Sequence, residues 1–222
     1  RRPSSDVTAR VEAATRGLPH DVVEVLGALA AQGHLAAERG ALAIADPSGA
    51  ALAALTASEA TRLRLAALGP DARRIVLAIA LAGGSLDPLT LATALGLEED
   101  AALDSLEALV QDALLRDCPG ADEVSLVHDR IGEALAASAS AAALAALRAA
   151  LARAIEASGE GDEARHRVAE LDLAAGSLED AARTVPVSVD ALAAAGLHAD
   201  AVERLDALLA LAMDRGVPAP PL

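Results

Sequence analysis

The side chains in this 222-residue chain best suited to bind a metal ion or move a proton are its histidines and its single cysteine, Cys118. No two histidines stand three or four residues apart, the spacing that places two ligands on one face of a helix. The sequence therefore predicts no helix-borne metal site. One cysteine also excludes an internal disulfide and a cysteine-rich zinc site. The five histidines are His20, His34, His128, His166 and His198.

His128 and Asp129 form the pair with the most direct catalytic interpretation, because a histidine oriented by a carboxylate can act as a general base. The same residues fit a structural role, in which Asp129 caps a helix through Ile131 and Leu135 and His128 lies at a strand-to-helix corner. Adjacent side chains rarely face one another, and no nucleophile stands out in the sequence. The capping role is therefore favoured, and no catalytic residue is predicted.

The absence of lysine excludes several enzyme classes. All 18 basic residues are arginine. A P-loop needs a lysine that contacts the phosphates of ATP, a protein kinase needs a strand lysine, and Schiff-base chemistry needs a lysine amine. The chain is therefore not expected to bind and hydrolyse ATP on its own.

The composition indicates a mainly helical, acidic protein. Hydrophobic residues make up 54% of the chain and no Phe, Trp or Tyr is present, so the core must consist of small aliphatic contacts, as between closely packed helices. A formal charge of −15 argues against nucleic acid or an anionic membrane as the main partner. No run approaches 18 uncharged apolar residues, so no membrane span is expected. The single cysteine fits a reducing cytosol, and a cytoplasmic location is expected.

The stretch 69–137 organises the predicted fold. Apolar periodicity and turn signals predict three helices, a two-stranded hairpin and a fourth helix, which is the order of a winged-helix domain. Residues 85–88 are expected to restart the chain as a helix, with Asp87 as its cap. The third helix is expected over residues 98–115, and the strands over residues 114–118 and 124–127.

The charges on the third predicted helix indicate whether this stretch could bind DNA. Its apolar stripe is expected at Leu103, Leu106, Leu109, Val110 and Leu114. Its polar side would expose six carboxylates, which repel a phosphate backbone, and only Gln111 as a neutral base-reading candidate. DNA binding is therefore not favoured. The carboxylates belong to Glu98, Glu99, Asp100, Asp104, Glu107 and Asp112.

The flanking segments complete five predicted parts. Residues 1–45 are expected to hold helices at 6–16 and 20–32 and a hairpin at 34–37 and 41–44. Residues 46–68 are expected to be a linker and a connecting helix, and 69–137 the winged helix. Residues 138–216 are expected to form helical-hairpin repeats, with Pro186 interrupting one helix, and 217–222 a tail.

Four sequence segments carry a family resemblance. They are residues 10–29 (RVEAATRGLPHDVVEVLGAL), 63–81 (LRLAALGPDARRIVLAIAL), 124–135 (VSLVHDRIGEAL) and 165–176 (RHRVAELDLAAG). In this order they resemble the C-terminal part of bacterial signal-transduction ATPases with numerous domains (STAND ATPases). The corresponding parts of that family are the end of a helical lid with a Gly-x-Pro motif, a winged helix, and the start of a tetratricopeptide-like arm. Maltose-activator-like regulators and ATPase-linked serine/threonine kinases carry such modules.

The resemblance implies roles for particular residues. Gly17 and Pro19 match the Gly-x-Pro motif, whose proline approaches the nucleotide, and His128, Asp129 and Arg130 match a structural signature. ATP or ADP with Mg would belong to an ATPase core upstream of residue 1, and no cofactor is expected in this segment. The implied partners are that core and a protein or small-molecule signal on the helical arm.

The function expected from the sequence is a non-catalytic segment that relays the nucleotide state of an ATPase to a helical sensor arm. Two alternatives remain open. One is a transcription regulator that binds DNA through the winged helix. The other is a helical scaffold for protein partners without a nucleotide role.

Overall fold

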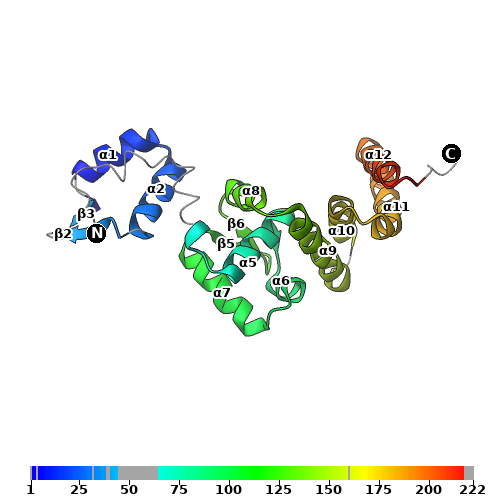
Figure 1. Ribbon diagram of the computed structural model, residues 1–222, viewed down its shortest axis with the longest axis horizontal. Helices are drawn as coiled ribbons and strands as arrows, with labels where there is room; N and C mark the ends of the chain where they lie inside the picture. Colours follow the sequence, from blue (N-terminus) through cyan, green and yellow to red (C-terminus); the bar gives the residue numbers. More distant parts are fainter. Residues whose placement is uncertain are drawn as a thin grey trace. The chain divides into compact units, whose positions relative to one another are not determined.

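The computed structural model describes residues 2–3, 5–31, 33–38, 41–44, 65–159 and 161–217. It is mainly helical, with 73% helix and 6% strand, which confirms the predicted fold class at this level. The chain divides into two compact units, Arg1–Gly69 and Pro70–Leu222 (Figure 1). Residues 46–64 of the predicted linker and connecting helix (46–68) and residues 218–222 of the predicted tail (217–222) lie outside the described residues. No described helix is long and apolar enough to cross a membrane.

Within its described residues up to 44, the first unit contains helices α1 and α2 and a small sheet. Helices α1 (Ser5–Thr15) and α2 (Pro19–Ala31) are followed by the hairpin of β2 (Leu35–Glu38) and β3 (Ala41–Ile44), as the sequence predicts. A further strand, β1 (Arg2–Pro3), pairs in parallel with β3. The helices bury apolar side chains that recur at helical spacing, which are Val7, Val11, Val25, Ala28 and Leu29.

The second unit begins with helices and a three-stranded antiparallel sheet. The helices are α5 (Pro70–Leu81), α6 (Pro88–Leu95), α7 (Glu99–Gln111) and α8 (Asp129–Ser138). The strands β4 (Ser85–Leu86), β5 (Leu115–Asp117) and β6 (Val124–Leu126) lie in the order β4-β6-β5. As predicted, Asp87 caps α6, since its Oδ1 accepts a hydrogen bond from the Thr90 N–H at 2.8 Å.

Two local predictions in this region are wrong, and one strand is missed. The missed strand is β4, because a two-residue strand leaves no alternation to detect. Helix α7 ends at Gln111 rather than at 115, because Ala113 adopts a φ of +53° and breaks the helical path. Leu103 is 41% exposed, because the buried side of α7 runs one position earlier, from Ala102.

Up to residue 217, where the described structure ends, four helices follow α8, and they are termed here the helical arm. They are α9 (Ala141–Ser158), α10 (Asp162–Ala175), α11 (Leu178–Ala194) and α12 (His198–Asp214). Each packs on the next, and α9 also packs on α6 (Figure 1). Side-chain oxygens of Ser140 and Ser177 cap α9 and α11. The arm therefore belongs to the same compact unit as the sheet.

Pro186 does not interrupt its helix, contrary to the prediction. Helix α11 continues through it, although a proline removes the N–H that would bond four residues back, to Ala182. Ala182 and Pro186 both lie on the exposed side of α11, so water can satisfy the released carbonyl. The opposite side buries Val185 and Ser188 completely, and this packing holds the helix together.

Candidate functional site in the helical arm

The residues singled out by the family resemblance lie at two turns in different units. Gly17, with a φ of +72°, ends the turn between α1 and α2, and the exposed Pro19 is the first residue of α2. His128 immediately precedes α8 and is half-buried, and Asp129 and Arg130 follow it as exposed residues in the first turn. Both sets therefore lie where a helix begins.

Asp129 does not cap α8, contrary to the prediction. The cap position belongs to His128, whose backbone is extended and whose side chain makes no capping hydrogen bond. Asp129 lies inside the first turn, where a carboxylate is stabilised by the partial positive charge of the helix start. The difference is one residue and follows from the strand-like φ of −147° at His128, which lets its carbonyl accept the first helical bond from Ile131.

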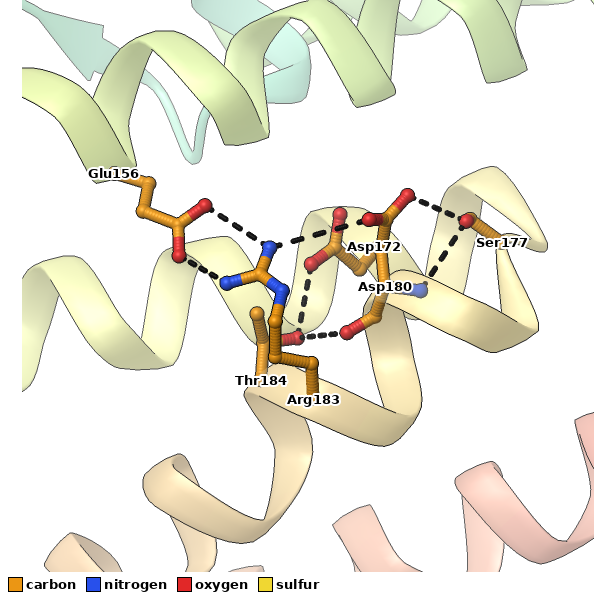
Figure 2. A network of polar contacts seen from close by, with 6 residues as sticks. All are labelled: Glu156, Asp172, Ser177, Asp180, Arg183 and Thr184. Carbon is orange, nitrogen blue, oxygen red and sulfur yellow. Dashed lines mark hydrogen bonds and ion pairs between the residues drawn. The ribbon is translucent and has the colours of Figure 1, made fainter.

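The most unusual polar group in the described structure is the carboxyl of Asp172, which is 2% exposed. It lies on α10 beside α11, and Thr184 Oγ1 donates to its Oδ2 at 2.8 Å (Figure 2). The same hydroxyl lies 3.0 Å from the carbonyl oxygen of Asp180. Because a hydroxyl has one proton, it donates to only one of these two acceptors at a time. Both hydrogen bonds form together only when Asp172 carries a proton and is itself the donor to Thr184 Oγ1.

Burial raises the pKa of the Asp172 carboxyl above the ordinary aspartate value of 3.8. The neighbouring carboxylates of Asp180 and Glu156 act in the same direction, while the hydrogen bond from Thr184 and the charge of Arg183 oppose it. A protonated Asp172 could donate to Thr184, and Thr184 could then donate to the Asp180 carbonyl. Burial therefore favours the neutral acid, whereas the hydrogen bond donated by Thr184 favours the carboxylate.

Around Asp172, charged side chains join α9 to α11. Arg183 makes a bidentate ion pair with Glu156 of α9, in which Nη2 donates to Oε2 at 3.0 Å and Nη1 donates to Oε1 (Figure 2). The Nη2 atom of Arg183 also lies 3.9 Å from Asp180 Oδ1. Asp180 also accepts a hydrogen bond from Ser177 at 2.6 Å. About half of the Arg183 side chain is exposed, so this pair adds orientation more than stability.

A pocket of about 260 Å³ opens beside this network. It combines two guanidinium groups, one carboxylate and one hydroxyl with an apolar wall. Glu156 already neutralises Arg183, and Asp162 pairs with Arg165 at 2.7 Å, so neither cation is left for a further anion. The lining residues are Glu156, Gly159, Ala164, Arg165, Val168, Arg183, Thr184 and Val187.

A second polar cluster joins α10, α11 and α12. His166 Nδ1 lies 2.8 Å from Ser188 Oγ, and Arg204 donates to that Oγ at 2.9 Å and to the His166 carbonyl at 2.8 Å. Arg204 also pairs with Glu170. A serine beside a histidine is the arrangement of an activated nucleophile, but Ser188 has no exposed surface and cannot meet a substrate. The cluster is therefore structural.

Sequence reasoning missed both polar clusters. Asp172 could have been detected, because it stands four residues after Val168 and three after Ala169, in the apolar stripe of α10. His166 contacts Ser188, which is 22 residues away in the sequence. No local pattern predicts that contact.

The described residues hold no group of three or more His, Cys, Asp or Glu side chains that could bind a metal ion. The two clusters instead tie neighbouring helices of the arm together, through Asp172 and Arg183 on one side and through Arg204 on the other. No protein-family model, no curated protein and no solved structure matches this chain.

Proposed function

We propose that this chain is a non-catalytic regulatory segment of a multidomain signal-transduction ATPase. In this proposal residues 69–137 are a winged-helix domain, and α9–α12 are a tetratricopeptide-like arm that binds a protein or small-molecule signal. Gly17 and Pro19 would contact the nucleotide or the ATPase core. The winged helix would transmit the nucleotide state of that core to the arm as a rigid connection.

The observation that carries this proposal is the position of Arg167. This α10 residue reaches the turn between α5 and β4, where its Nε and Nη2 donate to the Ala82 carbonyl at 2.9 and 2.6 Å and its Nη2 also donates to the Ser85 carbonyl. Its Nη1 lies 3.9 Å from Glu123, next to β6. The side chain is only 20% exposed. One arginine therefore connects the helical arm to the end of α5 and to strands β4 and β6 of the sheet.

Two further features support a coupling role over DNA binding. Thr90 of α6 and Ser158 at the end of α9 share a hydrogen bond of 2.6 Å, which adds a second tie between the two parts. On α7, Glu99, Asp100, Asp104 and Glu107 are all exposed, so this helix presents negative charge where a DNA-reading helix needs donors.

Replacing Arg167 with methionine is expected to loosen the arm. The change removes charge-assisted hydrogen bonds and leaves two carbonyls without this donor. Backbone amides of α10 should therefore exchange with solvent about tenfold faster, which corresponds to a decrease of about 1.4 kcal/mol in the free energy of local opening. Hydrogen–deuterium exchange followed by mass spectrometry measures this in the 222-residue chain. Arg165→Met is the matched control, because Arg165 is on the same helix and forms an ion pair with the exposed Asp162 of that helix. Equal exchange in both variants would remove the coupling argument.

The nucleotide role is tested by calorimetric titration of the chain with Mg-ATP. Without lysine, the chain alone should show no binding tighter than about 1 mM, where the binding free energy is about −4 kcal/mol. Micromolar binding by the chain alone would contradict the assignment as a non-catalytic segment.

A further inference from the structure

Three carboxylates and one guanidinium gather where α10 packs between α9 and α11 (Figure 2). The carboxylates belong to Glu156, Asp172 and Asp180, and the guanidinium belongs to Arg183. While Asp172 is protonated, Arg183 faces two negative charges, and it binds Glu156 with both of its Nη atoms. Ionisation of Asp172 adds a third negative charge to the group. One cation must then be shared among three anions.

The three carboxylates differ in their access to water. The side chains of Glu156 and Asp180 are 44% and 45% exposed, so water can hydrate both of them without a cation. Asp172 is 2% exposed, and a buried carboxylate has no such alternative. An unpaired buried charge costs far more free energy than an unpaired exposed one. The guanidinium therefore stabilises the group most when it pairs with an ionised Asp172.

Arg183 is placed to change partners in this way. It directly precedes Thr184 on α11, and Thr184 Oγ1 bonds to the Asp172 carboxyl at 2.8 Å. The positive charge of Arg183 already acts on Asp172, since it lowers the pKa of that carboxyl. The pocket of about 260 Å³ is lined by Arg183, Glu156 and Thr184, and the Arg183 side chain is half-exposed. The pocket therefore leaves room for this side chain to change rotamer.

Two further arginines approach α10 near Asp172, and both are engaged by backbone carbonyls. Arg148 of α9 donates to the Ala174 carbonyl at 3.2 Å, and Arg215 of α12 donates to the Gly176 carbonyl at 2.8 Å. Both satisfy carbonyls at the C-terminal end of α10, which have no partner within the helix. Among the described residues, Arg183 is the cation whose charge acts on Asp172.

We propose that Arg183 is a proton-controlled switch between two helices of the arm. It holds Glu156 of α9 while Asp172 is protonated, and it turns to Asp172 when that carboxyl loses its proton to the solvent. The turn releases α9 from α11 and leaves Glu156 to water. The contact is therefore strongest where Glu156 is ionised and Asp172 is not, and it is lost as the pH rises through the titration of Asp172. The switch lies within the arm and does not depend on the assignment to an ATPase.

Carbon-13 NMR of the side-chain carboxyls follows the switch in the 222-residue chain between pH 4 and pH 8. The Glu156 signal should show its own titration and a second step at the pH at which Asp172 titrates, because Glu156 then loses Arg183. Glu170, which pairs with Arg204 in the other polar cluster, is the matched control and should show no step at that pH. Amides in the last turn of α9 should exchange about two- to fivefold faster above that pH than below it, after correction for intrinsic exchange, as for the loss of a half-exposed ion pair.

Variants separate a movement of Arg183 from simple repulsion between the carboxylates. Asp172→Asn should remove the second step at Glu156 and the change in exchange, whereas Asp190→Asn, on the exposed side of α11, should keep both. Arg183→Met should also remove the second step, because no cation is left to move. A second step that persists in Arg183→Met would overturn the proposal, since repulsion alone would then explain it. In the original chain, the proposal is overturned if Asp172 does not titrate between pH 4 and pH 8, or if it titrates without a second step at Glu156.

Discussion

Replacing Gly132 with alanine is expected to lower the free energy of unfolding of the second unit by about 1–3 kcal/mol. Gly132 lies in α8 against α5, and a Cβ added to it would stand 2.3 Å from the Cβ of Ala80 and 3.2 Å from Leu126 Cδ1. Ala80 Cβ is fixed to its backbone and cannot rotate away, so the two helices must separate. This cost opposes the gain of about 1 kcal/mol that alanine normally gives over glycine inside a helix.

Urea unfolding followed by circular dichroism measures this effect, and a double-mutant cycle identifies its cause. Ala80→Gly removes the atom that the new Cβ would strike, so Gly132→Ala should cost much less in the Ala80→Gly background. Ala134→Gly, at an exposed position of the same helix, calibrates the helix-propensity term. An unchanged cost of Gly132→Ala in both backgrounds would show that contact with Ala80 is not its origin.

Most elements of the fold could be predicted because their signals are local. Asp87 and Pro88 begin α6 and Gly96 ends it within ten residues of sequence, and the structure has the expected cap and a left-handed Gly96. Helix α10 (Asp162–Ala175) begins and ends where glycines flank an apolar pattern. Such signals do not depend on the rest of the molecule.

The contacts that hold these elements together could not be predicted in this way. Arg167 meets the Ala82 carbonyl across 85 positions of sequence, and an exposed arginine of an ordinary surface helix has the same local pattern. Gly132 gives no turn signal, and its role is visible only when α8 lies against α5. These residues depend on the packing of distant segments, which a periodic pattern does not encode.

The second large effect is expected at Asp172. Because burial raises the pKa of its carboxyl, the folded chain holds a proton that the unfolded chain releases more readily. The stability that this proton contributes is fully present below the ordinary value of 3.8, and it is lost as the pH rises through the raised pKa of the folded state. A carboxylate in a favourable ion pair has the opposite effect, because its contribution to stability is lost as the pH falls.

Asp172→Asn tests this sign, since an asparagine resembles the protonated acid and cannot ionise. The variant should gain stability relative to the original chain as the pH rises from 4 to 7, by on the order of 1 kcal/mol. Urea unfolding at a series of pH values measures the difference. Asp190→Asn, on the exposed side of α11, should show little change with pH. A gain that shrinks toward pH 7 would mean that the fold stabilises the carboxylate instead.

Thr184→Val then isolates the hydroxyl between Asp172 and Asp180. Thr184→Val removes a 2.8 Å hydrogen bond at a position that is 7% exposed, and it should lower the free energy of unfolding by about 1–3 kcal/mol. Thr184→Ser keeps the hydroxyl and should lower that free energy less. The hydrogen bond from Thr184 lowers the pKa of Asp172, so its loss should move the titration of Asp172 to higher pH. Carbon-13 NMR of the aspartate carboxyl detects that movement. An upward shift in Thr184→Val that is absent in Thr184→Ser would assign the effect to the hydroxyl and not to repacking, because only the serine variant can still donate to the buried acid.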